Sequence, residues 1–349
     1  MRRVLLALAV LALLAGGCSK PEPEVVVAAS PSPSPSPSPS PSPPPPPIAA
    51  LTGVELAEPL DRPVLAVKID NASAALPPDG IEDADVVFEE EVEGGLTRFL
   101  VLFHSKDPKE VGPVRSGRES DADLLPQFQP VLGMSGAEPS VKDLFRGGEI
   151  RFFEEGEADG AFYRVPDRVA PHNLFAHTED LWGTADGLPT PTEPAFEFDE
   201  DAPAGGTETS SVALTYSNFA SAAWTWEPAT ERWEREQNGS GHATAEGRTI
   251  GSDNVIIMRV ESRAGDRTDS AGNPTLELDV IGKGRATFLR DGEAYQGRWK
   301  KDSAEDPLQW LDKDGDPFPL RPGQTWIQVL PLGDDLTVSD AGEGAAADE

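Results

Sequence analysis

The 349-residue sequence carries 61 acidic and 29 basic side chains, so its formal net charge is −32. This surplus of carboxylates repels nucleic acid, anionic headgroups and anionic wall polymers, and it argues against a nucleic-acid partner unless a local basic site intervenes. The chain has one cysteine, Cys18, which excludes a disulfide framework and a thiolate metal site within the fold.

The chain begins with an export signal. Arg2 and Arg3 precede an apolar run over residues 4–15, and small residues lead from there to Cys18. The run is too short for a permanent membrane span. Residues 1–18 resemble a lipoprotein signal peptide with its lipobox, which implies cleavage before Cys18 and lipidation of that residue, including palmitate. The alternative is an ordinary secretory signal that is cut elsewhere.

Residues 19–50 predict a stalk. Serine alternates with proline over residues 31–42, and five prolines follow at 43–47. Such a segment has no apolar face to bury and adopts extended polyproline conformations of about 3.1 Å per residue, roughly 50 Å in total. A spacer is favoured over a ligand for a proline-recognising partner.

Residues 51–200 predict an N-terminal α/β domain. Apolar runs at 64–70, 85–88, 99–103 and 150–153 indicate strands. Ser116 and Glu119 have the spacing of a capping box for a helix that ends before Pro126, Ser140 opens a second helix, and Thr178 caps a third. Strands interleaved with helices favour a layered arrangement.

Residues 201–210 have the composition of a linker, and residues 211–332 predict a mainly antiparallel β domain, either a small sandwich or an open barrel. Six of the seven tryptophans lie in this second domain, where core packing is favoured over a ligand groove. The acidic tail at 333–349 has no apolar periodicity and is expected to be disordered.

The order of several motifs resembles the YerB-like family of bacterial lipoproteins. The resemblance covers almost all of residues 51–331, and its most specific part is the Gly-Pro-Val-Arg-Ser-Gly-Arg segment at 112–118. It implies two paired domains whose activity is not established. Relatives tend to carry an acidic residue soon after the histidine-containing turn of the second domain, whereas Ala243-Thr244-Ala245 follows His242 here. The other motifs lie at 51–53, 67–71, 84–89, 93–99, 171–174, 282–286, 297–299 and 322–326.

Arginines surround the expected helix start at Ser116. Arg115 precedes it and Arg118 lies in its first turn, where a cation opposes the helix dipole. This placement predicts a pocket that accepts an anion, with Arg98 as a further donor. The alternative is an internal ion pair with a carboxylate such as Glu90, Glu91 or Glu93.

His172, Asn173 and His177 form a second candidate cluster with Glu179 and Asp180. Histidines near carboxylates can bind a metal or act as a general base, but their spacing matches no standard metal signature. Hydrogen-bonded loop histidines are therefore favoured. Residues 312–316 begin like a calcium loop but lack its closing glutamate, which favours a hairpin turn. We expect no metal and no cofactor.

The main functional hypothesis is a binding or interaction lipoprotein on the outer face of the cytoplasmic membrane, held there by its N-terminal lipid. Its partner would be a cell-wall component or another envelope protein. One alternative is a cell-wall hydrolase that uses His172 with a carboxylate such as Asp70 or Glu90. Another is a chaperone-like partner of an envelope protein. No recognised catalytic motif supports an enzyme.

Overall fold

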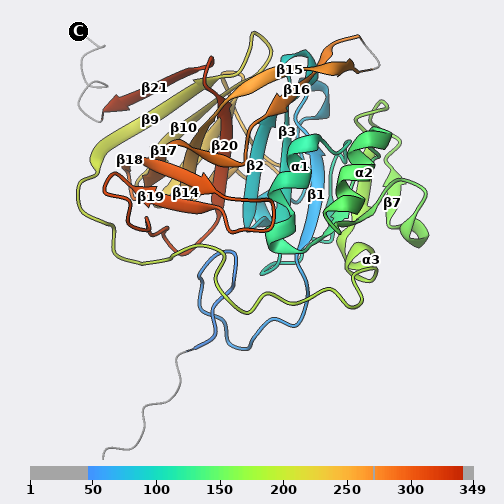
Figure 1. Ribbon diagram of the computed structural model, residues 1–349, viewed down its shortest axis with the longest axis horizontal. Coiled ribbons are helices and arrows are strands. Elements are labelled where there is room, and N and C mark those ends of the chain that lie inside the picture. The colour runs from blue at the N-terminus through green and yellow to red at the C-terminus, as the bar shows by residue number, and fades with distance from the viewer. Residues whose placement is uncertain (1–45, 270–271, 341–349) are drawn as a thin grey trace, which may run out of the picture. The chain divides into compact units, whose positions relative to one another are not determined.

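The computed structural model describes residues 46–269 and 272–340, and a long mixed sheet runs through it (Figure 1). In its N-terminal part, β2 pairs with β3 and β3 with β1 in antiparallel fashion, and the parallel strands β5 and β6 follow. The strands are β1 (Leu65–Asp70), β2 (Val86–Glu91), β3 (Thr97–Phe103), β5 (Val131–Gly133) and β6 (Arg151–Phe153). The mixed α/β character predicted for this half is confirmed.

The C-terminal half is mostly antiparallel, as predicted. In this sheet β9 pairs with β10 on one side and with β18 on the other. The sheet also curves back, because β13 pairs with β11 and the chain then passes directly into β14, which lies further along the same sheet. The strands are β9 (Thr207–Thr215), β10 (Ser221–Glu227), β11 (Arg232–Gln237), β12 (Ser240–Gly241), β13 (Gly251–Ser252), β14 (Asn254–Val260), β17 (Gly282–Arg290), β18 (Glu293–Lys301), β19 (Gln309–Asp312), β20 (Thr325–Pro331) and β21 (Asp335–Asp340). A separate hairpin, β15 (Ser262–Thr268) and β16 (Pro274–Leu278), leaves this sheet.

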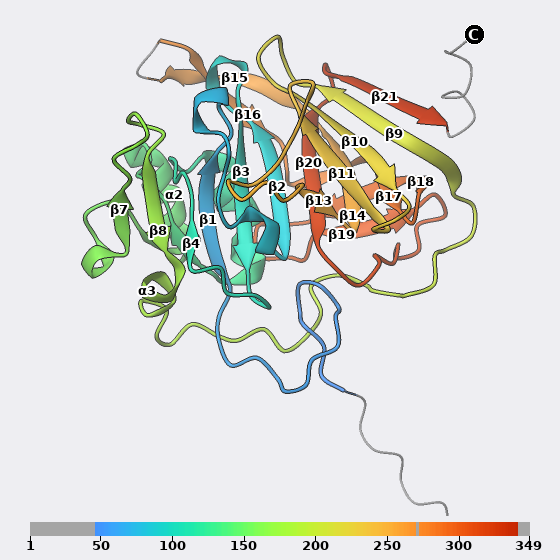
Figure 2. The same ribbon diagram turned by 180° about the vertical axis from the view of Figure 1, so that it is seen from behind.

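Helices cover one face of the N-terminal strands, and a small sheet lies on the other (Figures 1 and 2). The helices α1 (Glu119–Leu124) and α2 (Pro139–Gly147) pack apolar side chains against the first face. The second face is covered by α3 (Thr178–Trp182) and by the small sheet of β4 (Glu110–Val111), β7 (Phe162–Arg164) and β8 (Leu174–His177).

The two halves share their central strands. β20, close to the end of the chain, lies between β14 and β2 and is parallel to both. Trp326 is in register with Val87, and Gln328 with Glu89. The strands buried on both faces are almost wholly apolar, as expected for the centre of such a sheet. The described residues, 46–269 and 272–340, therefore belong to one compact unit.

Most tryptophans of the C-terminal half belong to the core. Trp224, Trp233 and Trp326 are fully buried, and Trp224 meets Trp326 edge to face with ring centroids 5.2 Å apart. Trp299 and Trp310 are buried in the cluster on the opposite face. Core packing is therefore the role of these rings.

Segment boundaries differ from the sequence-based expectations at three places. Ala49 and Ala50 are buried, so the fold begins before the expected end of the stalk at residue 50. β9 begins at Thr207, inside the expected linker at 201–210. β21 occupies residues 335–340 of the tail expected to be disordered, because β9 offers it a free strand edge.

Helix starts also differ. The residue that precedes the first turn of α1 is Arg118, not Ser116, and the Asp121 carboxylate accepts the Arg118 backbone N–H at 2.7 Å. Glu138 precedes α2, where Pro139 rather than Ser140 opens the first turn, and His177 precedes α3. Proline at the first helical position has no N–H to leave unsatisfied, which suits that start.

Candidate functional site

Strand pleating divides the polar residues of the central strands between two faces. Alternation places Lys68 and Asp70 of β1, Glu90 of β2 and Arg98 of β3 on the face covered by α1 and α2. In the ladder, Arg98 lies opposite both Asp70 and Glu90. The strand ends therefore bring the first candidate residues together.

The segment at 112–117 lies beside the end of β1. The Arg115 N–H donates to the Lys68 carbonyl at 2.8 Å, and the Ser135 N–H donates to the Arg115 carbonyl at 3.0 Å. A Cβ on Gly117 would come within 3.0 Å of Met134 and the Phe145 ring. Glycine at this position therefore allows the segment to approach the core closely and to present the flanking arginines.

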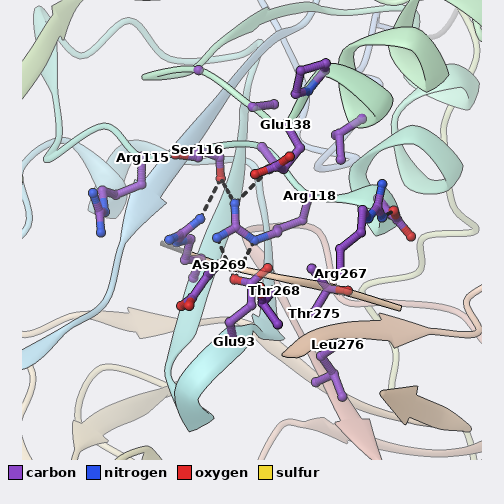
Figure 3. A pocket seen from close by; sticks show the side chains of 17 residues that line it. Glu93, Arg115, Ser116, Arg118, Glu138, Arg267, Thr268, Asp269, Thr275 and Leu276 are labelled. Carbon is purple, nitrogen blue, oxygen red and sulfur yellow. Dashed lines mark hydrogen bonds and ion pairs between the residues drawn. The ribbon is translucent and has the colours of Figure 1, made fainter. Parts of the chain in front are cut away.

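These residues line a cavity of about 410 Å³ between the N-terminal half and the β15–β16 hairpin (Figure 3). Both arginine and carboxylate side chains line it, together with apolar residues. Its lining includes Glu93, Arg98, Arg115, Ser116, Arg118, Glu119, Ala137, Glu138, Pro139, Val141, Arg267, Asp269 and Leu276.

Arg118 forms an internal ion pair. Its Nε and Nη2 donate to Glu93 Oε2 at 2.9 and 2.6 Å, and its Nη1 donates to the Gly117 carbonyl at 2.9 Å (Figure 3). Glu93 lies in the turn between β2 and β3, where Gly94 and Gly95 both have positive φ angles. For Arg118 the internal ion-pair alternative therefore describes the structure, with Glu93 as the partner.

Arg98 is a buried guanidinium that lacks such a partner. Only 9 % of the residue is exposed, and its Nη1 donates to the Ser116 carbonyl at 2.9 Å. Among the described residues no carboxylate forms an ion pair with Arg98. Burial, then the neighbouring Arg118 and Arg115, lower the pKa of Arg98 to about 9. A buried cation without a counter-ion is unfavourable unless an anion enters.

Arg115 and His172 share the Asp70 carboxylate. Arg115 Nε lies 3.0 Å and His172 Nδ1 2.7 Å from Asp70 Oδ2, while Asp70 Oδ1 accepts the Ala72 N–H at 3.0 Å. Within the described part of the chain, the two terminal nitrogens of Arg115 and His172 Nε2 form no hydrogen bond or ion pair. A neutral imidazole whose Nδ1 donates to a carboxylate presents Nε2 as a proton acceptor.

Glu90 lies outside the cavity, which corrects the expectation that it could occupy the arginine pocket. Lys68 Nζ is 3.0 Å from Glu90 Oε1 and 2.6 Å from Asp121 Oδ1, and all three side chains are fully buried. Ser120 also donates to Glu90. Burial, opposed by Lys68 and reinforced by Asp121, raises the pKa of Glu90 to about 7. A sealed carboxylate cannot reach a substrate.

Asn173 is not part of the arginine cavity either. Its Oδ1 accepts from Arg164 Nη1 at 2.6 Å, and its Nδ2 donates to the Val165 carbonyl at 3.3 Å. His177 stacks on Tyr163 with ring centroids 4.5 Å apart. Asn173 and His177 therefore make local contacts within their loop and strand, which is the hydrogen-bonded alternative. Of these three residues, His172 is the one that contacts Asp70.

A second polar cluster, on the opposite face of β2, escaped the sequence analysis. Glu89 Oε1 and Oε2 accept from Arg235 Nη2 at 2.9 and 2.7 Å, and Arg235 Nη1 lies 2.8 Å from His242 Nδ1. Burial, then Arg235, lower the pKa of His242 to about 2, so this imidazole is neutral. Asn71 Nδ2 also bridges Glu89 and Gln237. The cluster joins the two halves.

Two further expectations concern other parts of the chain. Asp312 Oδ1 accepts hydrogen bonds from the backbone N–H groups of Asp314, Gly315 and Asp316 at 2.8–2.9 Å. This segment is therefore a turn that is stabilised by an aspartate side chain. Cys18 and most of the expected stalk lie outside the described residues. Over the described ranges 46–269 and 272–340, no helix is long and apolar enough to cross a membrane.

The fold and the arginine segment define a family. Residues 51–190 match the model "Protein of unknown function (DUF3048) N-terminal domain", and residues 212–327 match its C-terminal domain. Together the two models cover most of the sequence, and the chain belongs to this two-domain family.

The chain is also similar to a named bacterial protein and to its crystal structure. The chain is 28 % identical over 306 residues to "Putative lipoprotein YerB" of Bacillus subtilis, a match that covers 85 % of this chain and 89 % of the relative. It also resembles the crystal structure of the YerB protein from Bacillus subtilis, with a TM-score of 0.73 and 26 % identity over 83 % of this chain and 99 % of that one. The YerB-like resemblance inferred from the motifs is confirmed.

Proposed function

We propose that this protein is a lipid-anchored binding protein of the cell envelope, with a cavity at Arg98 and Arg115 that takes an anionic group. The observation that carries the proposal is the buried Arg98 guanidinium, which lines the cavity without an ion-pair partner in the described structure. The unoccupied N–H groups of Arg115 add donors beside it. Guanidinium forks of this kind recognise carboxylates and phosphates.

Anion binding is tested by thermal unfolding of the purified protein in sodium acetate, phosphate or chloride at equal ionic strength. We expect acetate or phosphate to raise the unfolding temperature above its value in chloride, because a ligand that binds only the folded state stabilises it. Arg115→Ala should keep the fold and lose this increase. Arg146→Ala is the matched control, since Arg146 is exposed, lies outside the lining of the cavity and forms an ion pair with the exposed Asp143.

Two results would contradict this proposal. One is the same unfolding temperature in all three salts. The other is full anion protection in Arg115→Ala. If Arg115→Ala fails to fold, Arg115→Lys retains a cation beside Asp70 but loses the fork, and should weaken the protection.

The membrane anchor is the second part of the proposal. The lipobox-like sequence before Cys18 and the curated lipoprotein relative support it. We expect mass spectrometry of the membrane fraction to find acyl chains on Cys18, and Cys18→Ala to release the protein from that fraction or to block its processing. An unmodified thiol in the mature membrane-associated protein would contradict the anchor.

A hydrolase is the second candidate, and the 2.7 Å contact between His172 Nδ1 and Asp70 Oδ2 favours it. In that role, His172 Nε2 would take a proton from a water whose oxygen attacks the scissile bond of wall material, and the imidazolium would give that proton to the departing group as the bond breaks. The test incubates the protein with peptidoglycan fragments and looks for new products by mass spectrometry. Products that disappear in His172→Gln would support hydrolysis, whereas unchanged fragments would leave binding alone.

A further inference from the structure

The charges around the cavity do not balance pair by pair. Arg118 is neutralised by Glu93, and Arg267 forms an ion pair with Glu119. Arg115 lies beside Asp70. One lining cation, Arg98, remains without an ion pair among the described residues. An incoming group with a single negative charge would therefore complete the inner end of the cavity, whereas a dianion would add uncompensated charge near four lining carboxylates.

The outer part of the cavity has the opposite character. Glu138 is exposed at the start of α2, and no described residue forms an ion pair or side-chain hydrogen bond with its carboxylate. A positively charged group could approach Glu138 while a negative group meets Arg98. In Figure 3 Arg115 and Glu138 lie apart, with Ser116 labelled between them in this view.

An apolar wall lies between these charges. Ala137, Pro139 and Val141 contribute it from the start of α2, and Leu276 contributes from β16. The volume of about 410 Å³ falls in the range of small-molecule sites, which combine apolar walls with a few placed polar groups. A wall of this size suits a small aliphatic side chain.

From this arrangement we propose that the ligand is a short zwitterionic peptide, whose carboxylate binds Arg98 and Arg115 and whose amine faces Glu138. Its aliphatic side chain lies against Val141 and Leu276. This inference rests on the anion site proposed above and names the class of ligand for it. It also gives a role to Glu138, whose carboxylate forms no ion pair among the described residues.

The test measures binding to the purified protein by isothermal titration calorimetry. The probes are L-alanyl-L-alanine, its C-terminal amide, its N-acetyl derivative and inorganic phosphate. We expect the free dipeptide to bind most tightly, amidation to weaken binding about tenfold or more, and acetylation to weaken it severalfold, because each change removes one charge-assisted contact. Glu138→Gln should remove the penalty for acetylation and leave the penalty for amidation.

The controls separate this inference from the proposal beneath it. Phosphate that binds as tightly as the dipeptide, or an amide that binds as well as the acid, would overturn the peptide assignment while the anion site stands. If neither peptide nor phosphate binds, both fail. Glu149→Gln is the matched surface control for Glu138→Gln, because Glu149 is an exposed glutamate outside the lining of the cavity.

Discussion

At the scale of single residues, the adjacent glutamates Glu89 and Glu90 pair with different cations on opposite faces of the sheet. Strand alternation turns Glu89 toward Arg235 of the C-terminal half and Glu90 toward Lys68 beneath α1. Both carboxylates are buried, and each meets a buried cation. Two adjacent glutamates of one strand therefore belong to two separate polar networks, one on each face of the sheet.

Glu90 predicts a pH dependence of stability. Its folded-state pKa of about 7 exceeds its ordinary value of 4.5, so the folded protein holds this proton more tightly than the unfolded chain. The free energy of unfolding should therefore fall as the pH rises from about 4.5 to about 7, by on the order of 3 kcal/mol at most, and then level off. Urea unfolding at pH 5 and 8 measures the slope. Glu90→Gln should flatten it, and an unchanged slope would assign the effect to other groups.

Lys68 carries the complementary prediction. Lys68→Met leaves Glu90 and Asp121 buried side by side without a cation, which should lower the free energy of unfolding by about 3–5 kcal/mol near pH 7. Lys300→Met is the control, because Lys300 and its partner Asp302 are both exposed; it should cost less than about 1 kcal/mol. Equal losses in the two variants, measured by urea unfolding, would argue against a buried triad.

At the scale of elements, the sequence predicted strands better than helix starts. The apolar runs predicted at 64–70, 85–88 and 99–103 became β1, β2 and β3, because a strand that is buried on both faces is built almost wholly from apolar residues. The start of α1 escaped because its capping carboxylate, Asp121, also serves the buried Lys68, so tertiary contacts favour it over Ser116. The arginine cavity was predicted in part, from Arg98, Arg115 and Arg118. Arg267 comes from a distant hairpin and left no local signal.

The composition of the tail did not predict the strand β21. Its acidic surroundings suggested disorder, yet Leu336 packs toward the core and the strand pairs with β9. Leu336→Ala should lower the free energy of unfolding by about 1–2 kcal/mol, since a half-buried leucine loses part of its burial. Thr337→Ala, on the opposite and exposed face of the strand, should cost less than about 0.5 kcal/mol. Denaturant unfolding of the two variants compares them, and equal small effects would mean that β21 contributes little.

At the scale of the whole molecule, the two family domains share one continuous sheet. β20 supplies the strand that pairs with β2, and the buried Arg235 crosses to Glu89. The Arg235 guanidinium also lies 5.1–5.8 Å from the ring centroids of Phe99, Trp224 and Trp326. The cavity depends on the same union, because its walls come from both halves. A ligand bound there should therefore stabilise both.

This union predicts a single cooperative unfolding transition. An N-terminal half without β20 would expose one edge of β2 and leave Glu89 buried without its cation, so neither half should persist when the other unfolds. Calorimetry of the full chain should give one peak whose van't Hoff and calorimetric enthalpies agree. Arg235→Met should move that one peak to lower temperature, because it strands a buried carboxylate at a cost of about 3–5 kcal/mol. Two separated peaks, with only one shifted by Arg235→Met, would show that the halves fold independently and that the cavity between them is not held by a common core.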